Sequence, residues 1–84
     1  MENITKEEFL QGVTFTHKYK QERYKYGQTR QHDTYLIKQG GLMETVTVHT
    51  ITESSFVVNE LIFDASIDVV VLFADCFKIK HQLT

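Results

Sequence analysis

Hydrophobic and polar positions at the start of the chain have the spacing of a short capped helix. Thr5 and Glu8 stand three positions apart, as in a capping box, where each side chain bonds the other residue's backbone amide. Gly12 stands where a residue of left-handed conformation commonly ends a helix. Two hydrophobic residues occupy the staple positions, Ile4 and Phe9. We therefore predict a helix over Thr5–Gln11, too short to be stable unless it docks on the rest of the fold.

Beyond this helix, hydrophobic residues recur with period two, which is typical of β-strands. Phe15 and Tyr19 belong to one phase of the alternation, and Tyr24 and Tyr26 belong to the other. A bulge or turn at Lys20–Glu22 would reconcile the two registers. This part of the chain therefore forms either one bulged strand or two strands joined by a turn.

The clearest hairpin signal is Gln39–Leu42, because its two central glycines allow the positive φ angles of a type I′ turn. If Gln39 pairs with Leu42, then Leu36 lies opposite Thr45 on the following strand, Met43–Thr52. The polar residues 27–33 that precede this hairpin are predicted to form a loop.

Two further strands are predicted at Phe56–Phe63 and Val69–Ile79, joined by a five-residue loop, Asp64–Asp68. With that loop, one face of the strand pair carries Phe56, Val58, Ile62, Val70, Leu72, Ala74 and Cys76, and the other carries Leu61, Phe63, Val69, Val71 and Phe73. A sheet with one solvent-exposed face alternates more cleanly than this, so both faces need cover. A short helix covers only part of one face. The remainder calls for a curled sheet or a second copy of the chain.

Together these elements define an α+β fold: a short N-terminal helix followed by a twisted antiparallel sheet, meander or barrel-like, of five to six strands. The 84 residues make a single domain, 1–84, near the lower limit of what folds alone. A hydrophobic content of 42% favours an ordered core over a disordered chain.

The single cysteine, Cys76, excludes an intramolecular disulfide, which a secreted domain of this size would usually need. The N-terminus has no basic region leading into an apolar stretch, so we expect no signal peptide. The longest apolar run, Val69–Ala74, is too short to span a bilayer. We expect a cytoplasmic location and no membrane association.

One segment, His17–His32, concentrates positive charge and aromatic side chains in a chain of net charge −2: it holds five Lys/Arg, one Glu and three tyrosines. Its candidate interaction residues are Tyr19, Arg23, Tyr24 and Tyr26, of types enriched at interfaces. Its candidate anion contacts are Lys18, Lys20, Lys25 and Arg30. The same alternation of Lys and Tyr also occurs on ordinary exposed strands. A pI near 6.0 gives no strong electrostatic footprint for nucleic acid.

Residues with catalytic or metal-binding chemistry are scattered. The four histidines and the cysteine form no CxxC or HxxxH pair, so we predict no metal site. The glycines form no phosphate-binding fingerprint, and no cofactor is expected. Cys76 falls on an apolar strand phase, where cysteine behaves as a small hydrophobic residue, and the serines fall in turns. We therefore predict no catalytic residues.

The function that we predict from the sequence is a small non-enzymatic interaction module that self-associates, as a homodimer, or binds a partner chain. The absence of proline leaves edge strands open to pairing. The first alternative is binding of single-stranded nucleic acid through residues 17–32. The second is a small enzyme with a cleft covered by residues 27–33.

Overall fold

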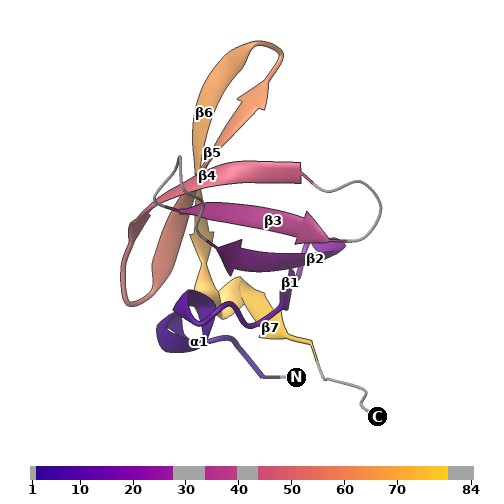
Figure 1. Ribbon diagram of the computed structural model, residues 1–84, viewed down its shortest axis with the longest axis vertical. Helices are drawn as coiled ribbons and strands as arrows, with labels where there is room; N and C mark the ends of the chain where they lie inside the picture. The colour runs from indigo at the N-terminus through magenta and orange to yellow at the C-terminus, as the bar shows by residue number, and fades with distance from the viewer. Residues whose placement is uncertain (1, 28–33, 40–43, 80–84) are drawn as a thin grey trace.

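The structure, a computed structural model, describes residues 2–27, 34–39 and 44–79. These residues form a short α-helix, a 3-10 turn and seven strands, in the order α1 (Lys6–Leu10), β1 (Phe15–His17), β2 (Lys20–Gly27), β3 (Tyr35–Gln39), β4 (Glu44–Ile51), β5 (Ser55–Ile62), β6 (Ala65–Leu72), η1 (Phe73–Asp75) and β7 (Cys76–Lys78). The strands make one antiparallel sheet in the order β6-β5-β4-β3-β2-β1-β7 (Figure 1). The predicted fold class is confirmed.

The number of strands exceeds the predicted five to six because the last predicted strand is divided. The prediction ran a single strand over Val69–Ile79, but β6 ends at Leu72 and η1 turns the chain before β7 begins at Cys76. A run of hydrophobic residues does not reveal such a turn, because Phe73 is a large buried hydrophobic residue, of the kind that also occupies core positions in strands.

The position of η1 also shows that the sheet is rolled. Only three residues separate β6 from β7, yet these strands are the two edges of the sheet. Seven strands in a flat sheet would place their edges about 29 Å apart. A three-residue connection spans only about 10 Å. The sheet therefore curls until its edges approach each other, leaving a seam between β6 and the β1–β7 edge.

Helix α1 closes one end of this roll through an aromatic cluster. The ring of Phe9 stacks on Phe56, with centroids 4.4 Å apart, and lies 4.7 Å from the ring of Tyr26. Phe15 and Phe73 complete the cluster, and all five side chains are buried. The helix is therefore held by packing, as its short length requires.

The capping signals in the sequence are confirmed. The Thr5 hydroxyl accepts from the Glu8 amide at 3.1 Å, and the Glu8 carboxylate accepts from the Thr5 amide at 3.0 Å. Gly12 has a φ of 85°, and its amide donates to the Phe9 carbonyl while the Val13 amide donates to the Glu8 carbonyl. These two bonds form a Schellman motif.

The turn between β5 and β6 differs from the prediction. Ile62 pairs with Ala65, so only Phe63 and Asp64 lie between the strands, in place of the predicted five-residue loop. Both turn residues have positive φ, 49° and 64°, as a type I′ turn requires. The shorter turn changes the register. Phe56 faces Val71, and Val58 faces Val69, so Val70 and Leu72 lie on the opposite face from the one predicted.

The register between β3 and β4 is one residue away from the prediction: Leu36 pairs with Val46 instead of Thr45. This register places both hydrophobic residues on the inner face, which the predicted one did not. The glycine turn at 40–41 and most of the predicted 27–33 loop lie outside the described residues.

The predicted irregularity at Lys20–Glu22 is confirmed, because the β1–β2 register shifts between Thr16 and His17, leaving two unmatched residues in β2.

Candidate functional site: an apolar arm and an adjoining cavity

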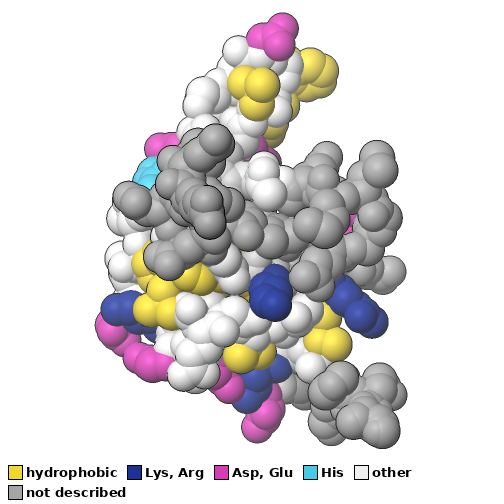
Figure 2. Space-filling model, in the orientation of Figure 1, with side chains coloured by type: hydrophobic (Ala, Val, Ile, Leu, Met, Phe, Trp, Pro, Cys, Tyr) yellow, Lys and Arg dark blue, Asp and Glu magenta, His cyan; other side chains and the backbone are white. Residues whose placement is uncertain are grey.

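The strands β5 and β6 extend beyond the rest of the sheet as an arm (Figure 1). Every residue from 61 to 70 is exposed, and among the described residues β6 pairs only with β5. Figure 2 shows hydrophobic side chains along this projection. The free edge of β6 is thus an eight-residue strand with one charged residue, Asp68.

Hydrophobic side chains lie on both faces of the arm, as the sequence predicted. On the inner face, which continues into the core, exposed side chains are Ile62, Ile67 and Val69. On the outer face they are Leu61, Val70 and Leu72, with exposed fractions of 73%, 62% and 47%. Phe63 at the tip is 99% exposed. Monomeric proteins rarely expose so continuous a hydrophobic surface without an interaction that uses it.

A polar cluster on the outer face fixes the register of the arm. The Asn59 amide donates to Ser66 Oγ and to Asp68 Oδ1, both at 2.8 Å. The same Asp68 oxygen lies 3.3 Å from His49 Nε2 on β4. The Asn59 and His49 contacts hold the pKa of Asp68 below its ordinary value. The only charge of β6 is therefore occupied within its own sheet.

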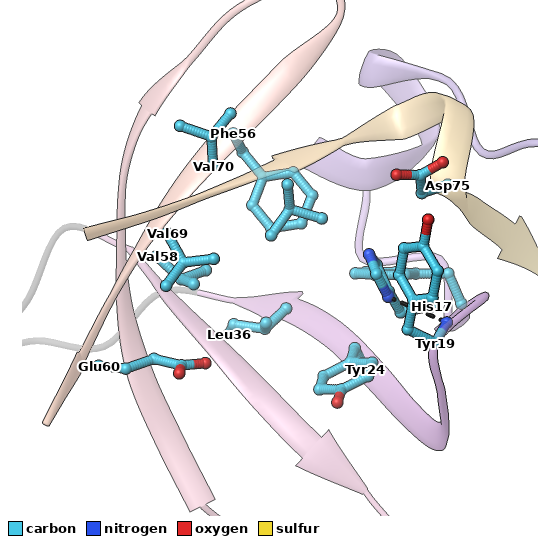
Figure 3. Close-up of a pocket in the computed structure, with 12 residues that line it drawn as sticks. His17, Tyr19, Tyr24, Leu36, Phe56, Val58, Glu60, Val69, Val70 and Asp75 are labelled. Atoms are coloured by element: carbon cyan, nitrogen blue, oxygen red, sulfur yellow. Dashed lines mark hydrogen bonds between the residues drawn. The ribbon is translucent and has the colours of Figure 1, made fainter. Parts of the chain in front are cut away.

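A cavity of about 300 Å³ opens beside the inner face of β6 (Figure 3). Its walls come from β1, β2, β3, β5 and β6, and include Phe15, Tyr24, Leu36, Phe56, Val58, Val69 and Val71. Figure 3 shows His17, Tyr19 and Asp75 at one end of the cavity and Glu60 at the other. The cavity is thus a hydrophobic space with polar groups at its ends, within the seam of the roll.

The end of the cavity near β1 is held by an ion pair. Lys18 Nζ lies 3.0 Å from Asp75 Oδ1 and 4.8 Å from the centroid of the Tyr19 ring. Contacts with Tyr19 and Asp75 raise the pKa of Lys18. The Tyr19 amide donates to His17 Nδ1 at 3.3 Å. These contacts join the β1–β2 turn to η1.

The four candidate interaction residues do not share one surface. Tyr19 is 72% exposed in the β1–β2 turn, and Arg23 is exposed on β2. Tyr24 is half-buried, stacks on Phe15 at 5.7 Å and lines the cavity. Tyr26 is only 7% exposed and belongs to the core, so it is not part of a surface. Tyr24 and Tyr26 are two residues apart on β2, so both side chains point to the same side of the sheet, which is the buried one.

The candidate anion contacts are also divided. Lys18 is paired with Asp75, whereas Lys25 is exposed on β2, on the same face as Arg23. The side chain of Lys20 and the whole of Arg30 lie outside the described part. Because Arg23 and Lys25 point away from the face of Tyr24, the cations of β2 and its aromatic rings face opposite sides. Stacking of bases beside phosphate contacts would need both on one side.

Phe63 and the edge of β6 were not among the predicted interaction residues. The predicted strand ended at Phe63, and the predicted loop, Asp64–Asp68, included residues that form the start of β6. The sequence did show that the last hairpin carries hydrophobic residues on both faces. This pattern predicts a surface that needs cover, but it does not show which strand forms the unpaired edge. Asp64, a residue that tolerates positive φ, was the only local sign of the tight turn.

Within the described residues, no three His, Cys, Asp or Glu side chains converge in a way that would hold a metal ion. The helices described there are too short to cross a bilayer. The chain matches no protein-family model, no curated protein and no solved structure. A function therefore has to be inferred from the arm and the cavity.

Proposed function

We propose that the protein is a non-enzymatic interaction module that self-associates, with two copies pairing through the free edge of β6. The observation that supports this proposal is the exposed, hydrophobic and unpaired edge strand of the arm. Natural proteins usually protect such edges with proline, lysine or a covering element, because an unprotected edge pairs with another strand. β6 contains no proline and no lysine.

The backbone of β6 has the alternation that strand addition needs. In a two-residue turn, the flanking residues Ile62 and Ala65 form a hydrogen-bonded pair. Pairs along an antiparallel ladder alternate between hydrogen-bonded and non-hydrogen-bonded types. The amide and carbonyl groups that face away from β5 therefore belong to Ser66, Asp68, Val70 and Leu72. These groups are available to a second strand.

A second copy fits this edge in one register better than in others. A two-fold axis at Val69 pairs residues 66–72 with residues 72–66 of the other copy, which uses nearly all of β6. Val69 then faces its own equivalent, and Asp68 faces Val70. An axis at Asp68 would instead oppose two carboxylates, and an axis at Val70 would shorten the pairing to five residues. Closed two-fold pairing is also the commonest form of protein self-association.

Covering the hydrophobic side chains is the driving force of this dimer. Pairing extends the sheet across both copies and brings Ile67 beside Val71 and Val69 beside Val69. Because the hydrophobic surface occurs on both faces of the arm, either face gains contacts on pairing. The cytoplasmic location expected from the sequence belongs to the same proposal and agrees with a buried, free Cys76.

Cross-linking tests both the dimer and its register. In Val69→Cys the two new thiols form a non-hydrogen-bonded pair, whose Cα separation of about 4.5 Å suits a disulfide. We expect rapid oxidation to a disulfide-linked dimer. Wild-type protein, with its buried Cys76, and Thr45→Cys, an exposed position on β4, should stay monomeric on a denaturing gel. Equal cross-linking of Val69→Cys and Thr45→Cys would contradict the proposal.

A charge introduced next to the axis gives an independent test. Val70→Asp would place two carboxylates opposite each other twice in the dimer, whereas Val70→Lys would place an ammonium opposite Asp68. Sedimentation velocity should show a dimer for the wild type and Val70→Lys, and a monomer for Val70→Asp. Thr45→Asp serves as the matched control. A wild type that stays monomeric at concentrations of several hundred micromolar would refute the dimer.

A further inference from the structure

Phe63 combines two properties that are unfavourable in an isolated chain. Its side chain is 99% exposed, and its φ is 49°. Asn, Asp and Gly are the residues that type I′ turns prefer, because positive φ brings the β-carbon of other residues too close to the backbone. Strained conformations persist mainly where they serve a function. A phenyl ring presented at the end of an arm is well placed to enter a second molecule.

The dimer register determines what that ring meets. With the axis at Val69, Ser66 of one copy pairs with Leu72 of the other, and the tip residues 63–65 continue past the end of that β6, where η1 (Phe73–Asp75) begins. Phe63 stands six residues from the axis, about 20 Å along its own arm. Asp75 lies at the end of the cavity near β1, together with His17 and Tyr19. The tip of each arm is therefore directed at η1 of the opposite copy and at the end of the cavity that adjoins it.

The cavity suits a phenyl ring in size and chemistry. Apolar cavities of about 150 Å³ accept benzene, and this one measures about 300 Å³. Phe15, Tyr24 and Phe56 contribute aromatic walls, and aromatic rings gain from tilted or offset contact with one another. The cavity also adjoins the free edge of β6, because Val69 and Val71 form part of its lining.

From these observations we infer that Phe63 of each copy inserts into the cavity of the other, so that the two arms exchange reciprocally. This inference rests on the proposed dimer and adds a specific anchor to it. Strand pairing supplies the backbone bonds, and the inserted ring supplies the contact that distinguishes this partner from any other exposed strand. The cavity in the seam is then a receptor for the arm of an identical chain.

A single tryptophan tests the inference, because the chain contains none. Phe63→Trp is combined with Val69→Cys, and the oxidised dimer is compared with the reduced protein at a concentration where it is monomeric. We expect the Trp emission to shift to shorter wavelength in the dimer and its quenching by acrylamide to fall. An exposed Trp spectrum in a dimer that does cross-link would overturn the insertion while leaving the dimer intact. Absence of cross-linking would instead overturn the dimer.

Truncation of the ring measures its contribution. Phe63→Ala should weaken the dimer by about 30-fold or more in dissociation constant, as loss of an interface hot spot does. The matched control is Asp64→Asn, which changes the neighbouring tip residue, keeps a side chain suited to positive φ and should leave the dissociation constant unchanged. Circular dichroism checks that both variants remain folded. Equal affinities of Phe63→Ala and the wild type would contradict the inserted ring.

Discussion

Asn3 shows how a single side chain secures the start of the chain to the seam. Its amide lies 3.2 Å from the Phe73 carbonyl, 2.9 Å from the Ala74 carbonyl and 3.1 Å from the Cys76 carbonyl. An amide nitrogen has two hydrogens, so these three acceptors share them. The arrangement adds a side-chain donor to carbonyl groups around η1, of which Phe73 and Cys76 also accept from the backbone amides of Cys76 and Ile4, and it ties the start of the chain to the turn that joins the two edges of the sheet.

Cys76 is a buried group, within the described part of the chain, whose ionisation the fold opposes. Its side chain is fully buried, and burial, with a smaller effect of Asp75, raises the pKa of its thiol from the ordinary 9.0 to about 12. The Sγ atom lies 3.5 Å from the Leu72 carbonyl, to which the thiol donates. A neutral, protonated thiol is therefore part of the folded structure.

This shift predicts a loss of stability in alkali. The thiol loses its proton at lower pH in the unfolded chain than in the folded one, so its contribution is complete below pH 9.0 and declines as the pH rises towards about 12. The slope is about 1.4 kcal/mol per pH unit in that interval. Urea unfolding at pH 8, 9 and 10 should show a steeper decline for the wild type than for Cys76→Ala. Parallel declines would show that the thiol ionises freely in the folded protein.

At the scale of elements, the structure agrees with the sequence where the signals are local. The capping box, the staple residues Ile4 and Phe9, and the left-handed Gly12 lie within nine residues, and together they determine where α1 begins and ends. The end of the helix depends on Gly12 most directly. A β-carbon there would lie 3.4 Å from Lys25 Cε and from the Tyr26 carbonyl oxygen, which is tight but tolerable. The backbone conformation is therefore the main constraint.

Gly12→Ala should accordingly lower the free energy of unfolding by about 1–2 kcal/mol, the cost of a left-handed conformation for a residue with a β-carbon. The matched control is Gln11→Ala, whose side chain is exposed and whose backbone is in the ordinary helical region, and it should change stability little. Both values come from urea unfolding followed by circular dichroism. Equal effects of the two substitutions would contradict a conformational origin.

Signals that depend on distant residues were less informative. The β3–β4 register is set by which residues of both strands face the core, so the glycine pair alone misplaced Leu36 by one residue. The β5–β6 turn was misplaced because Phe63-Asp64 lacks the glycine that normally indicates a two-residue turn. For the same reason the sequence indicated an uncovered hydrophobic hairpin but assigned the interaction to Tyr19, Arg23, Tyr24 and Tyr26.

For the whole molecule, a rolled sheet with a single seam has two edges to protect. The β7 edge is short and adjoins the N-terminal segment, where Asn3 bridges to Phe77 and the Lys78 amide donates to the Glu2 carbonyl. The Lys78 side chain also lies 2.8 Å from Glu8, which joins this edge to α1. The β6 edge has no comparable cover among the described residues. The asymmetry between the edges is why the proposed pairing uses β6.

The tip of the arm should therefore show a trade-off between stability and association. Replacing Phe63-Asp64 by Asn-Gly supplies the preferred type I′ residues and should raise the free energy of unfolding of the monomer by about 0.5–2 kcal/mol. The same double substitution removes the ring that we place in the opposite cavity, so it should weaken the dimer. Urea unfolding at low protein concentration and sedimentation equilibrium measure the two effects separately. A variant that gains stability and keeps full dimer affinity would show that Phe63 does not contribute to association. Higher monomer stability together with weaker dimerisation would instead explain why a strained, exposed phenylalanine occupies this turn.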